Sequence, residues 1–346
     1  MKHLGKMFHR LFLIAIMIAS GLATNGTASV PDNCTPSEGS SCQAYTVLGR
    51  PEEFTTSSTG VKLAVRRWIP EEIKSVVVFH HGAAGWHTGC SEIMGNALRN
   101  AGIAVIAYDT VGSGYSDALQ GGMRNYFDSI DTLTADFTKI LRDVRSEYPE
   151  KKVFALGESF GCMVLLTQIL QEQENGKEDG SLADGYIFSG PVVKVLPEML
   201  PPKPVIKVLN FVSRFFPLLK MPGTDFFSTF DLAFGDKGWA QAGRNDPMIQ
   251  EAATIPPRLG MAASILTNMD KMYDSLGDIR VPFKIFLGEN ESRVDVSAVK
   301  HLARVAKSTD KEIEIVEGGF HQLFQDRANV TAFVCDCIAA WISARS

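Results

Sequence analysis

Residues 153–166 read Val-Phe-Ala-Leu-Gly-Glu-Ser-Phe-Gly-Cys-Met-Val-Leu-Leu, and this stretch decides the fold that the sequence predicts. Apolar residues before Gly157 indicate a short buried strand, and apolar residues from Met163 onward indicate a helix. The Gly-x-Ser-x-Gly pattern between them is typical of a nucleophile elbow, a sharp turn that lifts a serine hydroxyl above a sheet. Gly157 and Gly161 suit this turn because they lack a Cβ where the strand and helix backbones crowd the serine. We therefore predict that Ser159 is a nucleophile at the end of a strand.

Strand and helix patterns alternate along the rest of the chain. Short β-branched and aromatic runs indicate buried strands, and longer runs with apolar residues every three to four positions indicate helices. We expect a hairpin over residues 53–69, further strands at 75–80, 103–108, 152–156, 185–189, 282–287 and 312–316, and helices at 91–101, 128–148, 295–307 and 331–343. This alternation predicts an α/β fold, with a mostly parallel central sheet flanked by helices.

The alternation stops between residues 191 and 257, where prolines and large apolar residues are more numerous than one helix face requires. We therefore predict one α/β domain in two parts, 52–190 and 266–346, with a helical lid inserted at 191–265. Exposed apolar surface usually belongs to an interface, which favours contact between this lid and a lipid-like substrate or, transiently, a membrane surface. The alternative is a helical subdomain that packs on the core and has no contact with the substrate.

The first 28 residues have the layout of a secretory signal peptide. Basic residues precede an uninterrupted apolar run at 11–19, and small residues follow that run. The apolar run is too short for a comfortable membrane span. We therefore expect a signal peptide at 1–28, a flexible lead-in at 29–51, and a secreted or endomembrane protein. The alternative is a signal anchor that is not cleaved.

The composition is that of a globular protein with a large core. The 346 residues are 45% hydrophobic and 21% charged, and the formal net charge is -5. This acidic balance argues against nucleic acid as a partner. No cysteine and histidine have the spacing of zinc ligands, so we expect no metal and no cofactor. Cys162, on the predicted helix behind Ser159, is expected to be a buried free thiol.

A serine nucleophile requires a base, and His321 is the strongest candidate among the seven histidines. It lies in a glycine-rich loop directly after the last predicted strand. Catalytic groups of open α/β sheets collect at the carboxyl ends of the strands, the edge where the elbow also lies. His321 also comes last in the order serine, acid, histidine, which is typical of folds with such an elbow. The alternative is a loop histidine that caps the final helix.

The base in turn requires an acid that orients it, and the loop after the strand predicted at 282–287 offers three carboxylates. Glu291 lies three residues past the loop glycine, where an acid can turn back towards His321. Asp295 precedes the apolar face of the next helix, a position typical of an N-cap. We therefore favour Glu291 as the acid and keep Asp295 as the alternative.

The loop after the strand at 75–80 supplies the candidate oxyanion hole. It contains a glycine and two alanines, small residues that let the backbone approach a substrate. We expect the N–H groups of Ala83 and of Phe160, which follows the nucleophile, to form the hole. We expect His81 to orient this loop by hydrogen bonds, without proton transfer. The glycine-rich stretch 109–117 lies outside the context of a dinucleotide site, so we interpret it as a tight structural loop.

Taken together, these motifs resemble the monoacylglycerol lipase and lysophospholipase branch of the α/β-hydrolases, also described as serine aminopeptidase-like hydrolases. The resemblance covers residue 52 to the C-terminus, and its matching pieces lie in family order. They are His81-Gly82, 109–116, Gly157-Glu158-Ser159-Phe160-Gly161, Asn245-Asp246-Pro247, Leu287-Gly288-Glu289 and Gly318-Gly319-Phe320-His321. The resemblance implies an α/β-hydrolase fold and serine ester hydrolysis of a substrate with a lipid-like acyl chain, without a cofactor.

Two departures from the family pattern concern the site. The family usually has aspartate where this chain has Glu291, which keeps Asp295 in consideration. The glycine after the elbow is commonly doubled in the family, whereas Cys162 follows Gly161 here. We predict a serine hydrolase that cleaves monoacylglycerol- or lysophospholipid-type esters through an acyl-enzyme on Ser159. The alternatives are a general carboxylesterase, a thioesterase or a peptidase on the same fold, and a non-catalytic binding protein.

Overall fold

The computed structural model describes residues 45–83, 85–119, 122–174, 182–197, 200–221, 227 and 230–346. The signal peptide predicted at 1–28 lies outside the described residues, and so does most of the lead-in predicted at 29–51. All the strands that the sequence predicts fall within the described part of the chain.

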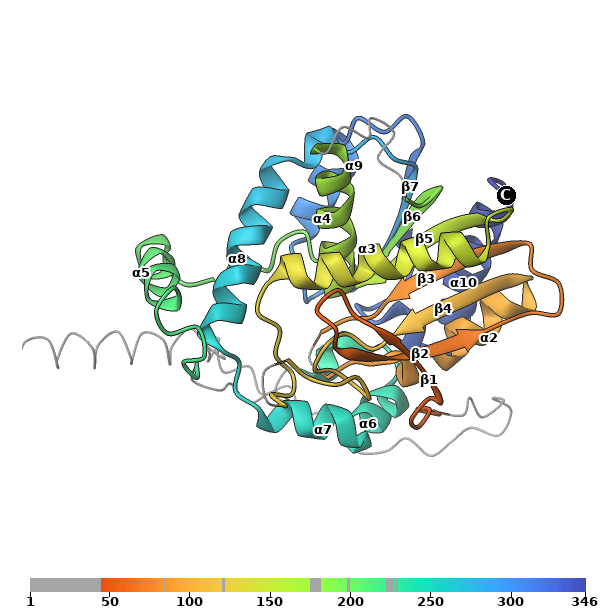
Figure 1. Cartoon of the computed structure of the whole chain (residues 1–346). Helices are drawn as coiled ribbons and strands as arrows, with labels where there is room; N and C mark the ends of the chain where they lie inside the picture. The colour runs from red at the N-terminus through yellow and green to blue at the C-terminus, as the bar shows by residue number, and fades with distance from the viewer. Residues whose placement is uncertain are drawn as a thin grey trace, which may run out of the picture.

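One sheet of eight strands runs through the described part of the chain, in the order β1-β2-β4-β3-β5-β6-β7-β8 (Figure 1). β1 and β2 form the predicted hairpin, β2 is antiparallel to β4, and the other neighbours pair in parallel. The mostly parallel sheet that the sequence predicts is therefore confirmed. The bounds are β1 Glu53–Thr56, β2 Lys62–Trp68, β3 Ser75–His80, β4 Ile103–Tyr108, β5 Lys152–Glu158, β6 Gly185–Ser189, β7 Phe283–Gly288 and β8 Lys311–Val316.

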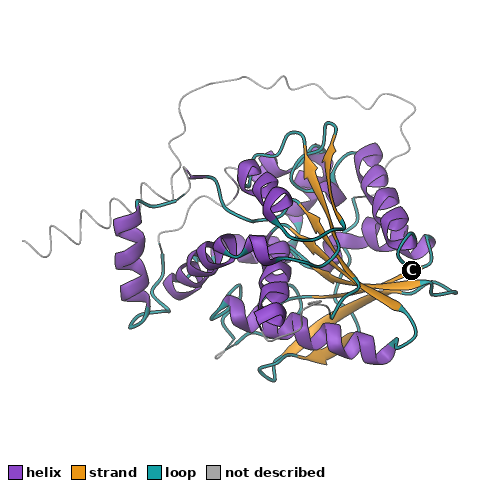
Figure 2. Cartoon of the chain, turned by 90° about the horizontal axis from the view of Figure 1, so that it is seen from above, coloured by secondary structure: helices purple, strands orange, loops and turns teal. Residues whose placement is uncertain are grey.

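Helices cover both faces of this sheet, as Figure 2 shows. On one face, α2 (Glu92–Asn100) and α10 (Ala328–Ser343) contact each other and share an apolar cluster with the strands. On the other face, α3 (Ile130–Glu147), α4 (Phe160–Glu174) and α9 (Val296–Val305) pack on a larger cluster. Strands that are covered on both faces are continuous apolar runs, and β3 and β4 are accordingly buried at every residue.

The described chain between β6 and β7 forms helices and no named strand. Its elements are α5 (Lys203–Ser213), η4 (Phe230–Ala233), α6 (Lys237–Asn245), α7 (Pro247–Thr254), α8 (Leu259–Asp274) and η5 (Leu276–Asp278). Residues of η4, α6 and α7 form a third apolar cluster with the loop after β3, around Trp86 and Trp239. α5 contributes no buried residue and stands away from the sheet (Figure 1).

The boundary predicted at residue 265 falls inside α8. Met269 and Met272, in the second half of this helix, are buried in the larger core cluster, and α8 contacts α4. The same helix also contacts α5, which lies outside the core. One continuous helix therefore joins the segment between β6 and β7 to the core. Its apolar pattern does not mark the point where the packing partner changes, so the sequence cannot locate that point.

Cysteines and short turns complete the described structure. Cys90, Cys162, Cys335 and Cys337 are free thiols, and Cys162 is fully buried, as predicted.

Among the described residues, no helix has both the length and the apolarity needed to cross a membrane. Within the same ranges, no group of histidine, cysteine and carboxylate side chains is arranged to hold a metal ion. Two 3-10 turns lie in the loops after β3 and β8, η1 (Thr88–Ser91) and η6 (Leu323–Gln325).

Candidate active site

The turn between β5 and α4 holds Ser159 in a strained backbone conformation. The φ angle of Ser159 is 52°, in the left-handed region that residues with a side chain rarely adopt. Its N–H donates to the carbonyl oxygen of Ser189 on β6 at 2.8 Å. A Cβ at Gly161 would collide with the carbonyl oxygen of His80, so glycine lets α4 begin this close to β3. The local sequence thus makes the elbow, and the neighbouring strands hold it in place.

Three side chains from three loops at the carboxyl edge of the sheet form one hydrogen-bonded chain. Ser159 Oγ lies 2.8 Å from His321 Nε2, and His321 Nδ1 lies 2.7 Å from Glu291 Oε2. The three residues follow β5, β7 and β8, which are parallel strands whose ends meet at the same edge. The structure therefore brings together the serine, the histidine and the favoured acid that the sequence predicts.

Glu291 is held as a carboxylate although it is shielded from water. Its side chain has no exposed surface, and the side chain of His321 is 7% exposed. Burial favours the neutral acid, but the hydrogen bond with His321 and the N–H groups of Arg293 and Val294 outweigh it and lower the pKa of Glu291. A carboxylate beside Nδ1 keeps a proton on that nitrogen and leaves Nε2 free to accept the hydroxyl proton of Ser159.

Asp295, the alternative acid, serves the start of α9 instead. Its carboxylate accepts hydrogen bonds from Ser297 N–H at 2.9 Å and from Ala298 N–H at 3.2 Å. The residue is thus the N-cap of α9, as predicted. In the described part of the chain, no hydrogen bond joins Asp295 to His321.

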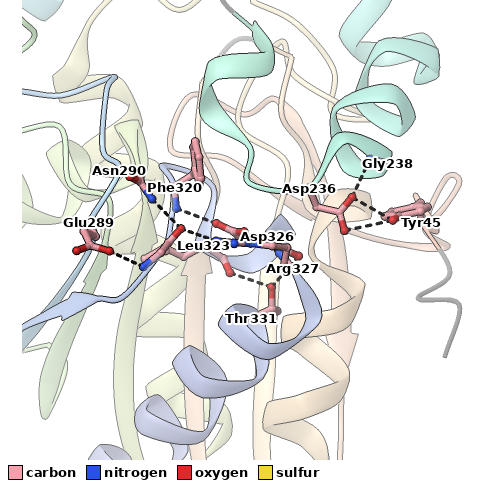
Figure 3. A network of polar contacts seen from close by, with 11 residues as sticks. Tyr45, Asp236, Gly238, Glu289, Asn290, Phe320, Leu323, Asp326, Arg327 and Thr331 are labelled. Carbon is pink, nitrogen blue, oxygen red and sulfur yellow. Dashed lines mark hydrogen bonds and ion pairs between the residues drawn. The ribbon is translucent and has the colours of Figure 1, made fainter. Parts of the chain in front are cut away.

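Asp326 holds the loop that carries His321 against the start of α10 (Figure 3). Its carboxylate accepts hydrogen bonds from Phe320 N–H at 2.8 Å and from Arg327 N–H at 2.7 Å. The side chain of Asp326 is fully buried, and Arg327 Nε also lies 3.3 Å from it. One carboxylate therefore fixes the backbone directly before His321 to the beginning of the last helix.

The loops after β7 and β8 are also tied to each other (Figure 3). Glu289 accepts a hydrogen bond from Gly318 N–H at 2.8 Å, and Asn290 Nδ2 donates to Gly318 O at 3.0 Å. Glu289 and Asn290 directly precede the acid, and Gly318 lies three positions before the base. These bonds set the spacing of the two loops, and with it the distance between Glu291 and His321.

The loop after β3 passes directly over the nucleophile. A Cβ at Gly82 would lie 3.5 Å from Ser159 Cβ, so the loop backbone and the serine are in close contact. Ala83, the next residue of the loop, is exposed, and Phe160 is nearly buried at the start of α4. In the described part of the chain, neither of their N–H groups donates to a protein acceptor. Both predicted oxyanion donors are therefore available to a substrate oxygen beside Ser159.

His81 fixes the course of this loop. Its Nε2 accepts a hydrogen bond from Thr110 N–H at 3.0 Å, and its Nδ1–H donates to Gly82 O at 2.6 Å. Burial lowers the pKa of His81, so the ring is neutral and both of its nitrogens are engaged. These contacts agree with the prediction that His81 orients the loop without transferring protons.

Asp109 connects the same loop to the one after β4. It is fully buried, and its carboxylate accepts hydrogen bonds from Thr88 N–H at 2.7 Å and from Tyr115 N–H at 2.8 Å. Its carbonyl oxygen accepts a further bond from Ser116 Oγ at 2.5 Å. The stretch 109–117 is therefore a tight structural loop beside the site, as predicted.

Sequence reasoning assigns no role to Asp246, which the structure places in a buried pair with His87. Asp246 Oδ1 lies 3.3 Å from His87 Nε2, while Gly89 N–H donates to His87 Nδ1 at 3.2 Å. Asp246 also caps α7, because it accepts from the N–H groups of Met248 and Ile249 at 2.9 Å each. The pair joins the segment between β6 and β7 to the loop after β3. An aspartate before a proline signals the cap, but nothing in the sequence links it to His87.

A cavity of about 490 Å³ opens beside Ala83 and Phe160. It lies between the loops after β3 and β4, the approach to α3, and the chain from α7 to α8. Its volume falls in the range of small-molecule sites. Much of its lining is apolar, with Val111, Phe127, Leu133, Phe160, Met261 and Ile265.

These groups together have the chemistry of acyl transfer. A serine hydroxyl lies against a histidine, and the histidine lies against a buried carboxylate. Two N–H groups that have no acceptor within the described residues lie next to the serine, and a largely apolar cavity lined by Gly82, Ala83 and Phe160 opens beside them. Such a set can make and break an ester bond to Ser159 without a further group.

Known proteins match this chain over most of its length. A family profile described as "Serine aminopeptidase, S33" matches residues 71–328, a range that contains Ser159, Glu291 and His321. Human monoglyceride lipase is 27% identical over 293 residues, which cover 84% of this chain and 89% of that protein.

Two solved structures are similar in fold. A soluble variant of monoglyceride lipase from Saccharomyces cerevisiae, in complex with a substrate analog, has a TM-score of 0.70 at 19% identity. That match covers 86% of this chain and 96% of the yeast chain. The monoacylglycerol lipase of Paleococcus ferrophilus has a TM-score of 0.65 at 22% identity, over 82% of this chain and 99% of its own.

Proposed function

The chain belongs to the serine aminopeptidase S33 family of hydrolases, and from this premise we propose that it cleaves monoacylglycerol-type esters through an acyl-enzyme on Ser159. The protein is a serine ester hydrolase. The observation that carries the finer proposal is the hydrogen-bonded chain from Ser159 through His321 to Glu291. The monoglyceride lipases among its relatives support the choice of substrate.

The proposed reaction proceeds in two halves. Ser159 Oγ attacks the ester carbonyl carbon while His321 Nε2 takes the hydroxyl proton, and Glu291 stabilises the imidazolium that results. His321 then gives this proton to the leaving alcohol, which departs and leaves an acyl group on Ser159. In the second half a water molecule loses a proton to His321 and attacks the acyl carbon. The bond between that carbon and Ser159 Oγ then breaks, His321 returns the proton to Oγ, and the carboxylic acid is released.

We propose that Ala83 and Phe160 stabilise the tetrahedral intermediate. Each would donate its N–H to the substrate oxygen as that oxygen becomes negative, and such a donor contributes about 3 kcal/mol in studied hydrolases. Phe160 is the first residue of α4, so its N–H also lies at a helix N-terminus, where the helix dipole favours negative charge. The absence of a protein acceptor for either N–H within the described residues supports this role.

The acyl chain would occupy the cavity beside these donors. Its apolar lining and its volume of about 490 Å³ suit a flexible hydrocarbon chain better than a polar peptide. The segment between β6 and β7 supplies part of the wall through Ile255, Met261 and Ile265. We propose that this segment, predicted as a lid at 191–265, covers the substrate.

We propose further that the lid segment makes a transient contact with a membrane surface. Phe211, Phe215 and Phe216 are 61%, 64% and 63% exposed, on α5 and just after it. The stretch 200–221 carries four basic residues and no acidic one, in a chain whose net charge is -5. Exposed aromatic residues beside basic ones are typical of helices that lie on a lipid surface. The arrangement supports docking of the enzyme where lipid substrates reside.

We also propose that the protein is exported, on the layout of residues 1–28 alone. Basic, apolar and small residues follow one another there as in a signal peptide. Sequencing the N-terminus of the mature protein tests this, because a mature chain that begins at Met1 would contradict cleavage.

The variant Ser159→Ala tests the proposed chemistry. It should lower kcat for a soluble p-nitrophenyl ester by about 10⁴-fold or more, because no nucleophile remains. It should also abolish labelling by a fluorophosphonate probe. Ser146→Ala is the matched control, since Ser146 lies on α3, where its hydroxyl donates to Arg142 O of the same helix. Labelling of the Ser159→Ala protein at the wild-type level would refute the serine assignment.

A substrate panel tests the choice of ester. Monoacylglycerols of several chain lengths, a lysophospholipid, a short carboxylic ester, a thioester and a peptide amide would be compared by kcat/KM. The proposal expects the highest value for a monoacylglycerol. A highest value for the short ester would indicate a general carboxylesterase, and turnover of the amide alone would indicate a peptidase.

A further inference from the structure

Glu158, directly before the nucleophile, is a buried carboxyl group that the reaction above does not use. It is the last residue of β5, and its side chain is fully buried. Neither of its carboxyl oxygens has a hydrogen-bond partner among the described residues. A buried acid without a partner costs free energy, so its position beside Ser159 requires a physical explanation.

The indole of Trp86 is the polar group that acts on Glu158 from the loop after β3. Interaction with its N–H lowers the pKa of Glu158, against the larger and opposite effect of burial. Trp86 Nε1 is itself buried, and it lies outside hydrogen-bond geometry with any described acceptor. The backbone N–H of Trp86 donates to Ala83 O at 3.3 Å. Trp86 therefore interacts both with Glu158 and with the backbone of a proposed oxyanion donor.

Trp86 is also held by packing contacts. Its ring centroid lies 5.9 Å from that of Phe234, and both residues belong to the apolar cluster shared with η4, α6 and α7. A Cβ at Gly82 would lie 3.8 Å from Trp86 Cδ1, so the ring packs against the loop residue that touches Ser159. A small displacement of Trp86 would therefore move the loop over the nucleophile.

Burial raises the pKa of Glu158 to about 8, so the carboxyl group is mostly protonated near pH 7 and gains a charge as the pH rises. Ser189, aligned with it on β6, does not titrate, and burial raises the pKa of Cys162 on α4 well above its ordinary range. Burial lowers the pKa of His80, at the end of β3, to about 3, so that ring carries no charge either.

We propose that Glu158 is a positioning residue that acts as a neutral carboxylic acid. A protonated carboxyl group has one acceptor and one donor, which can serve the indole N–H of Trp86 and the hydroxyl of Ser189. In this state a small adjustment of either side chain lets Glu158 accept the indole N–H, and so hold Trp86 and through it the loop that carries Ala83. Loss of the proton puts a buried negative charge one residue from Ser159, where it opposes the charge that develops on the substrate oxygen. The proposal rests on the function proposed above and adds control of that site by pH.

Glu158→Gln is the variant that separates charge from shape. Glutamine keeps the size, one acceptor and a donor, but it cannot ionise. Wild-type kcat for a soluble p-nitrophenyl ester should fall about tenfold per pH unit above the pKa of Glu158, as for one ionisation. In Glu158→Gln this alkaline loss should disappear, with kcat at neutral pH retained. Glu158→Leu, which neither donates nor accepts, should lower kcat at every pH while KM changes little.

Trp86→Phe provides an independent measurement if Glu158→Gln does not fold. Phenylalanine keeps a ring but removes the N–H that lowers the pKa of Glu158, so the alkaline loss should move to higher pH. An alkaline loss that persists unchanged in Glu158→Gln would overturn the proposal, and so would an unchanged loss in Trp86→Phe if Glu158→Gln does not fold. Equal kcat values for Glu158→Leu and Glu158→Gln at neutral pH would also overturn it.

Fluorophosphonate labelling distinguishes an error in the role of Glu158 from an error in the proposed serine chemistry. If wild type is labelled at Ser159 but its kcat is constant across the alkaline range, the role of Glu158 is wrong and the serine chemistry stands. If wild type is not labelled at any pH, the serine chemistry itself is wrong, and with it the proposal that depends on it.

Discussion

Strand β5 and helix α5 are both rich in apolar residues, yet the fold uses them in opposite ways. Every residue of β5 after the first is buried, because β3 and β6 flank the strand and helices cover both faces of the sheet. α5 buries none of its residues, and its main contact is with α8. An apolar run therefore predicts that its surface will be buried against something. The topology decides whether it is buried by other parts of the same chain.

This difference separates two kinds of variant. Changes at the edge where β5 ends should impair turnover of every substrate or the stability of the fold. Changes on α5 should leave both intact and affect only substrates that reside in a lipid surface. The following pairs of variants test the contrast, in decreasing order of expected effect.

Glu291→Gln should have the largest effect, a loss of about 10³–10⁴-fold in kcat. The amide can donate to His321 Nδ1 and so favours the tautomer whose Nε2 cannot accept the proton of Ser159. Asp295→Asn is the matched control, because asparagine caps a helix as well as aspartate does. The measurement is kcat on a soluble ester, with thermal melting to show that both variants fold. A large loss in Asp295→Asn alone would give Asp295 the role of the acid.

Gly161→Ala should have an intermediate effect, a loss of about 1–3 kcal/mol in the free energy of unfolding. The new Cβ would meet the carbonyl oxygen of His80, so α4 must move away from β3 and carry the Phe160 N–H with it. Gly277→Ala is the control, because the nearest atom to its Cβ would be Val305 O at 3.8 Å. Urea unfolding compares the two. Equal midpoints would contradict close packing at the elbow.

The double variant Phe215→Ser, Phe216→Ser should have the smallest effect. The two rings are 64% and 63% exposed, so the free energy of unfolding should change by less than about 0.5 kcal/mol per site. Turnover of a soluble ester should stay at the wild-type level, while turnover of monoacylglycerol in vesicles should fall. Phe333→Ser, on α10 and 44% exposed, is the control. If this control and the double variant turn over the vesicle substrate equally, α5 and the turn after it are not the docking surface.

The central sheet could be predicted because its strands are continuous apolar runs bounded by polar turns. β3, β4 and β6 have the same bounds as predicted, and the hairpin of β1 and β2 also forms as expected. The sequence showed that the segment between β6 and β7 departs from the alternation of strands and helices, but it did not show where that segment ends and the core resumes. Its helix α8 has one continuous apolar period but packs against two different parts of the protein. The period shows which face of the helix is buried, but it does not identify the residues that cover that face.

The residues of the candidate site could be predicted from the sequence more readily than the contacts between them. Ser159, Glu291 and His321 each follow a strand of one parallel sheet, and that topology brings them to one edge. The choice between Glu291 and Asp295 needed the loop geometry, because both are carboxylates within five residues of each other. The environment of Glu158 lay beyond the sequence altogether, since Trp86 reaches it from a loop more than seventy positions away.

By itself the sequence determined the parallel sheet, the elbow and the order of serine, acid and histidine, because these depend on local periodicity, glycine positions and strand succession. Only the tertiary structure decided which carboxylate meets His321, that Asp246 pairs with His87, and that Glu158 is buried and interacts with Trp86. Those outcomes depend on distances between residues far apart in the chain, and such distances are set by packing of the whole core. A local pattern specifies a residue's own conformation, whereas its charge state and partner are properties of the fold around it.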